Sequence, residues 1–158
     1  MAALDVITRL LKPGDEVIAG DDLYGGTNRL LTYLKTHTGV IVHHVDTTNP
    51  SSLHPVLNPT KTAMVLLESP TNPLLKIADL AQIATDVRLR APNAIIVVDN
   101  TMMSPYLQRP LEHGADIVYD SGTKYLSGHH DLMAGVVTCN RDDIAKVRCF
   151  GGAFFVTI

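Results

Sequence analysis

The chain has 158 residues, of which 46% are hydrophobic and 18% are charged, a composition that excludes intrinsic disorder and predicts one domain with a sizeable core. Its net charge of −3, from 13 basic and 16 acidic residues, gives no reason to expect a nucleic-acid or membrane-surface partner. No apolar run approaches the roughly 18 residues that a membrane-spanning helix needs, so we expect no membrane partner.

Helical and extended patterns alternate along the chain. In chain order they predict a helix over 3–12, a strand over 16–20, a helix over 27–37, a strand over 40–45, a weak helix over 51–58, a strand over 62–68, a helix over 79–90, strands over 94–98, 115–119 and 133–138, and a closing helix over 141–150. A threonine or asparagine cap opens the second helix, and Pro55 interrupts the weak one.

This alternation predicts the fold class, an α/β domain with a doubly wound, mainly parallel sheet. In such sheets, ligands bind beyond the carboxyl ends of the strands. Four polar segments rich in Gly or Pro follow predicted strands, "DDLYGG", "ESPTNP", "DNTMMSP" and "DSGTKYLSGHHD". The pattern therefore predicts that these segments gather on one rim and form a binding site.

Lys124 stands in the last of these segments. The simpler interpretation is a solvated surface lysine. Its neighbours favour another, because Ser121 and Thr123 offer hydroxyls, and with Gly122 they offer backbone N–H groups, which together are the parts of an anion cradle. A lysine beside a phosphate cradle at a strand end can form a Schiff base with an aldehyde cofactor.

Three further residues of the predicted rim are candidates. Asp99 ends an apolar strand and is either a turn aspartate or the partner of a buried cation such as a protonated pyridine nitrogen. Tyr24 precedes two glycines and is either a half-buried tyrosine or a ring that stacks on a flat cofactor. Asn72 lies between two prolines that restrict the backbone, and it is either a turn residue or a ligand contact.

Other site classes lack support in the sequence. The histidine pairs at 43–44 and 129–130 chelate poorly, because adjacent side chains on a strand point to opposite faces, so we expect no metal site. There is no GxSxG elbow, no GxGxxG and no GxxxxGK[ST]. Cys139 and Cys149 form no CxxC pair and indicate free thiols in a reducing compartment, which favours a cytoplasmic location.

Four motifs together resemble the Cys/Met-metabolism family of pyridoxal-phosphate-dependent enzymes. They are "GDDLYGGTNRL", "ESPTNP", "VVDNTMMSPYLQRPLEHGADIV" and "SGTKYLSGHHDLMAGV", in the order and spacing of that family. The segment "DSGTKYLSGHHDLMAGV" is most similar to the corresponding segment of fungal cystathionine β-lyases. The resemblance implies the aspartate aminotransferase-like fold, called fold-type I, with pyridoxal 5′-phosphate as cofactor.

The resemblance also implies roles for the candidates. Lys124 would form the Schiff base with the cofactor and move protons, Asp99 would pair with the pyridine nitrogen, and Tyr24 would stack over the ring and assist catalysis. The expected reaction is the cleavage of cystathionine, an amino-acid thioether, to homocysteine, pyruvate and ammonia. A cystathionine γ-lyase or another γ-elimination or γ-replacement enzyme stays open as an alternative.

The resemblance further implies contacts to the phosphate and the 3-hydroxyl group of the cofactor, and it implies an oligomeric state. Ser121 and Thr123 would bind the phosphate, and Asn72 would lie near the 3-hydroxyl of the ring. Full-length members of the family are homotetramers, so we expect a homo-oligomer with an incomplete interface.

We further expect the chain to be a fragment. Residues 1–150 would form part of the cofactor-binding large domain, and 151–158 would be a divergent apolar tail. An N-terminal arm and a C-terminal small domain would be absent. The isolated chain would then have little or no lyase activity, and a non-catalytic fragment or partner subunit is the remaining alternative.

Overall fold

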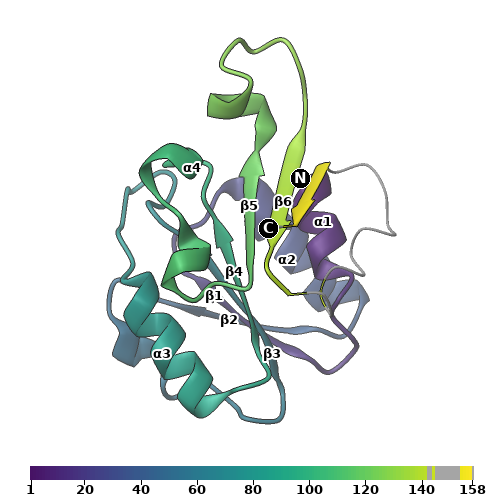
Figure 1. Ribbon diagram of the computed structural model, residues 1–158. Helices are drawn as coiled ribbons and strands as arrows, with labels where there is room; N and C mark the ends of the chain where they lie inside the picture. Colours follow the sequence, from purple (N-terminus) through teal and green to yellow (C-terminus); the bar gives the residue numbers. More distant parts are fainter. Residues whose placement is uncertain (142–143, 145–153, 158) are drawn as a thin grey trace.

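The computed structural model describes residues 1–141, 144 and 154–157, and it contains one mixed β-sheet (Figure 1). The seven strands have the spatial order β2-β1-β3-β4-β5-β6-β7. All neighbouring strands are parallel except β5 and β6, which are antiparallel. The strands are β1 Glu16–Gly20, β2 Ile41–Val45, β3 Thr62–Glu68, β4 Ile95–Asp99, β5 Ile117–Ser121, β6 Gly135–Cys139 and β7 Phe154–Thr157.

Helices cover both faces of this sheet, α1 and α2 on one and α3 on the other (Figure 1). The helical segments are α1 Ala2–Thr8, α2 Gly25–His37, η1 Pro50–Leu53, α3 Leu80–Arg90, α4 Ser104–Leu107, η2 Pro110–His113 and η3 Gly122–Leu126. Among the described residues, no helix has the length and apolar character needed to cross a membrane.

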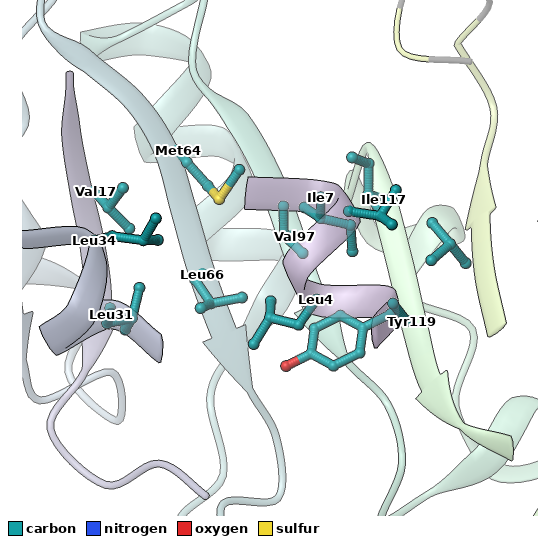
Figure 2. Packing of buried hydrophobic residues seen from close by; sticks show 14 of the residues in the cluster. Leu4, Ile7, Val17, Leu31, Leu34, Met64, Leu66, Val97, Ile117 and Tyr119 are labelled. Atoms are coloured by element: carbon teal, nitrogen blue, oxygen red, sulfur yellow. The ribbon is translucent and has the colours of Figure 1, made fainter. Parts of the chain in front are cut away.

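Two apolar cores hold the layers together. On the first face, Leu4 and Ile7 of α1 lie over Val97, Ile117 and Tyr119 of the sheet (Figure 2). On the second face, α3 packs its buried side onto alternate residues of the same strands. Because successive side chains of a strand point to opposite faces, each central strand contributes to both cores, which explains its continuous apolar run.

The predicted fold class is confirmed: the sheet is mainly parallel, and it is doubly wound. Several local predictions were wrong. The helix predicted over 3–12 ends at Thr8, and the strand predicted over 115–119 is Ile117–Ser121. The helix α2 begins at Gly25 instead of Thr27, and its N-cap is Tyr24, with no side-chain cap. The weak helix over 51–58 is the short 3₁₀ turn η1, because Pro55 has no N–H group to continue a helical ladder.

The structure describes only some of the carboxyl-terminal residues for which elements were predicted. Within the predicted apolar tail, β7 lies beside β6 and adds a strand to the sheet. The predicted helix over 141–150 lies outside the described residues except for Arg141 and Ile144.

Candidate functional site

A cavity of about 720 Å³ lies at the carboxyl end of the central parallel strands. The loop between β5 and β6 projects beyond the sheet there, at the same end as α4 (Figure 1). Each of the six candidate residues lines this cavity: Tyr24, Asn72, Asp99, Ser121, Thr123 and Lys124. The volume falls within the range of about 300–1,000 Å³ that is usual for small-molecule sites.

Lys124 is exposed and lies in the π-helical turn η3. It has φ −90° and ψ −119°, outside the helical range, so the turn is kinked at this residue. No described residue accepts a hydrogen bond from the Lys124 amine or forms an ion pair with it. The amine is therefore available to a molecule in the cavity.

The turn that carries Lys124 is tied to its neighbours on both sides. The Thr123 hydroxyl accepts a hydrogen bond from the Ala134 N–H (3.1 Å) and donates one to the Ala134 carbonyl (3.4 Å). The Ser121 N–H donates to the Thr101 hydroxyl at 2.9 Å. Of the two candidate phosphate ligands, Thr123 thus has a hydroxyl already engaged by the backbone of the chain.

Tyr24 and Gly26 lie in close contact at the start of α2. The Tyr24 ring packs so near the helix that a Cβ atom on Gly26 would lie 2.6 Å from the ring carbon Cε1. The ring itself remains about half exposed and lines the cavity. Glycine at position 26 therefore permits this ring position.

Three titratable side chains form a row across the sheet. Glu68 lies opposite Asp99 in the register of β3 and β4, and Asp99 lies opposite Tyr119 in that of β4 and β5. All three line the cavity. No lysine, arginine or histidine among the described residues forms an ion pair with Glu68 or Asp99.

Burial changes the acidity of these groups and of Asp120, which follows Tyr119. Burial raises the pKa of Asp99. Burial raises the pKa of Glu68 to about 7, with a contribution from the charge of Asp99. Burial and the same charge raise the pKa of Asp120 to about 6. The cavity is thus a site with excess negative charge, which a bound cation would relieve.

We expect the chain without ligand to become less stable as pH rises from about 5 to about 8. Glu68 has an ordinary value of 4.5 and a folded pKa of about 7, so between these values the folded chain binds its proton more tightly than the unfolded chain. Stabilisation by that proton is lost as pH rises, on the order of 3 kcal/mol for Glu68. Urea unfolding across this pH range measures the effect, and a free energy of unfolding that increases with pH would contradict it.

Glu68, Tyr119 and Asp120 were not among the residues predicted for the site. Each stands at or next to the end of an apolar run, as Asp99 does, and this shared position was the available signal. Asp120 Oδ1 is buried and has no hydrogen-bond partner among the described residues.

Comparison with known proteins decides the family. The sequence pattern described as "Cys/Met metabolism PLP-dependent enzyme" matches residues 1–152. The chain belongs to the Cys/Met-metabolism family of pyridoxal-phosphate-dependent enzymes. Both the resemblance inferred from the four motifs and the expected fold are thereby confirmed.

Members of this family from several organisms are similar to the chain. Cystathionine β-lyase of Neurospora crassa is 67% identical over 150 residues, covering 95% of this chain and 33% of the relative. Cystathionine γ-lyase of Dictyostelium discoideum is 47% identical over 149 residues, covering 94% and 38%. The crystal structure of metB from Corynebacterium glutamicum has a TM-score of 0.89 at 39% identity, covering 98% of this chain and 41% of that one. The chain spans about a third of the length of these curated relatives.

Proposed function

We propose that this chain is the cofactor-binding part of a carbon–sulfur lyase that uses pyridoxal phosphate to cleave cystathionine to homocysteine, pyruvate and ammonia. One observation carries the proposal: an available amine, Lys124, and a buried carboxyl, Asp99, which forms no ion pair with a described lysine, arginine or histidine, line the same cavity. The 67% identity to a cystathionine β-lyase supports the choice of reaction.

The residues of the cavity fit the cofactor chemically. The Lys124 amine would condense with the cofactor aldehyde and release water. Asp99 would accept a hydrogen bond from the protonated ring nitrogen, and that positive charge would offset the excess negative charge of the cavity. When bound, the cofactor supplies an electron sink for the pair left at the substrate carbon after proton removal.

The other candidates would orient the ring. Tyr24 would cover one of its faces, and Asn72 would donate a hydrogen bond near the 3-hydroxyl group. The Ser121 hydroxyl makes no hydrogen bond with the described residues and would be open to the phosphate. Thr123 would contribute its backbone N–H more readily than its engaged hydroxyl. The Lys124 amine would also be placed to move protons between substrate carbons.

A γ-lyase is the second candidate, because relatives named cystathionine γ-lyase reach 47% and 46% identity over more than 90% of the chain. A homo-oligomer in the cytoplasm remains our proposal for assembly and location. The products separate the two activities, since cleavage on the β side leaves a three-carbon keto acid and cleavage on the γ side leaves a four-carbon one.

Incubation with pyridoxal phosphate followed by borohydride should label one peptide, that containing Lys124. Visible absorbance before reduction reports the Schiff base. Met1 also lines the cavity, so the map must separate its α-amine from Lys124. Label on Met1 alone, or no label, would contradict the proposal.

Cystathionine is then added to the chain loaded with cofactor. Pyruvate supports the β-lyase, and the four-carbon keto acid supports the γ-lyase. Cofactor bound at Lys124 with neither product supports the non-catalytic alternative.

A further inference from the structure

Glu68 occupies an unusual position for a carboxylate. It ends β3, only 5% of its surface is exposed, and it has no cationic partner among the described residues. An unpaired buried carboxylate is costly unless hydrogen-bond donors surround it. The hydrogen bonds of Glu68 show which groups are these donors.

Two backbone N–H groups converge on the Glu68 carboxyl. The Tyr24 N–H donates to Oε2 at 3.0 Å, and the Asn72 N–H donates to Oε1 at 2.7 Å. Tyr24 lies 44 residues away and is the N-cap of α2, where the helix dipole favours a negative charge. Asn72 lies in the loop that follows β3. One side chain thus joins two rim segments that line the cavity.

Only a carboxylate serves both donors well. It offers two oxygen acceptors, whereas an amide of the same shape would turn an NH₂ group toward one of the backbone donors. Protonation of the carboxyl has a similar effect, because one oxygen then carries a hydrogen. The bonding of both segments therefore depends on the charge of Glu68.

We propose that Glu68 is a positioning residue, whose carboxylate holds the backbone of Tyr24 and Asn72 so that their side chains are set for the ligand of the cavity. The identity of that ligand, pyridoxal phosphate, rests on the proposed function. The bonds themselves are present without it.

The two hydrogen bonds to Glu68 form a clamp between the Tyr24 and Asn72 segments. Ligand binding would affect this clamp through the charges around Glu68. The titratable groups that act on Glu68 are Asp22 of the loop after β1, Asp99 of β4 and Tyr119 of β5. A cationic ring beside Asp99 would offset the Asp99 charge, which raises the pKa of Glu68 more than the Asp22 charge does, and so would lower the pKa of Glu68. Binding would then favour the ionised form, in which both hydrogen bonds are made.

The test measures amide hydrogen exchange of the whole 158-residue chain by NMR, without cofactor and at about pH 8, where Glu68 is mostly ionised. In the Glu68→Gln variant, the hydrogens of the Tyr24 and Asn72 amides should exchange about tenfold faster, as expected when charge-assisted hydrogen bonds are lost. Glu112→Gln is the matched control, because Glu112 is exposed and should leave both amides unchanged. In a second arm, Glu68→Gln should bind pyridoxal phosphate about tenfold more weakly while the adduct still forms at Lys124.

A pH titration of the unsubstituted chain keeps the proposal testable if Glu68→Gln does not fold. The Tyr24 and Asn72 amide signals should titrate with one common midpoint, and pyridoxal phosphate should move that midpoint to lower pH. Amides that titrate independently, or exchange unaffected by Glu68→Gln, would overturn the clamp. Faster exchange with unchanged cofactor affinity would overturn its positioning role. Failure of the unsubstituted chain to bind cofactor would overturn the proposed function, while the exchange data would still decide the clamp.

Discussion

Replacing Lys124 by alanine should reduce the borohydride-stable adduct with pyridoxal phosphate to less than about a tenth of its normal amount. Lys124 is the only lysine that lines the cavity in the described part of the chain. In any form of the protein that turns over cystathionine, kcat should fall by at least about 10²–10⁴-fold, because the same amine would also move protons. Mass spectrometry of the reduced adduct and a keto-acid assay measure the two effects.

Lys61→Ala is the matched control for this substitution. Lys61 is exposed at the start of β3 and does not line the cavity, so its loss should leave the adduct unchanged. Equal labelling of Lys124→Ala and the unsubstituted chain would show that another amine captures the cofactor. The role proposed for Lys124 would then be wrong, even if the cavity still bound the cofactor.

Asp116→Ala should destabilise the chain by about 2–4 kcal/mol, because a buried N–H group and two partly exposed guanidinium groups lose a shared acceptor. Asp116 is 4% exposed and lies just before β5. Its Oδ2 accepts from Arg88 Nη2 at 2.7 Å and from the Ile96 N–H at 2.8 Å, and its Oδ1 accepts from Arg141 Nη1 at 3.1 Å. The substitution removes an acceptor from two guanidinium groups and from a buried N–H group, and it loosens α3 from the sheet.

Urea unfolding followed by circular dichroism measures this loss. Small domains have a total stability of about 5–15 kcal/mol, so the variant should be partly unfolded at moderate temperature. Glu112→Ala provides the comparison, because its ion pair with Arg109 is exposed on both sides and should contribute less than about 1 kcal/mol. Equal midpoints for the two variants would show that the Asp116 network does not stabilise the fold.

Most of the fold was predictable because strong local patterns coincide with buried elements. The strands β1 and β3 have the predicted ends, since their apolar runs are bounded by charged or turn-forming residues. The start of α2 was not predictable in this way. Its N-cap, Tyr24, has no side-chain cap, and its N–H is bonded instead by Glu68, a residue 44 positions away.

The candidate site was predictable in its membership but not in its electrostatics. Family motifs and strand-end positions singled out Lys124, Asp99 and Tyr24, and all three line one cavity. Glu68 was overlooked, because a glutamate after an apolar run is usually just the end of a strand. Its importance depends on the register that sets it opposite Asp99.

The fold class and the family were predictable from the amino-acid sequence, and so was Lys124 as a candidate, because periodicity and motifs are local properties of the chain. Which groups share a desolvated space depends instead on the folding of distant segments onto one another. Glu68, Asp99 and Tyr119 come from three strands and become neighbours through parallel pairing. Burial raises the pKa of all three groups, and the charge of Asp99 raises those of Glu68 and Tyr119 further. No segment has these effects until the sheet has formed and α1 and α2 cover it.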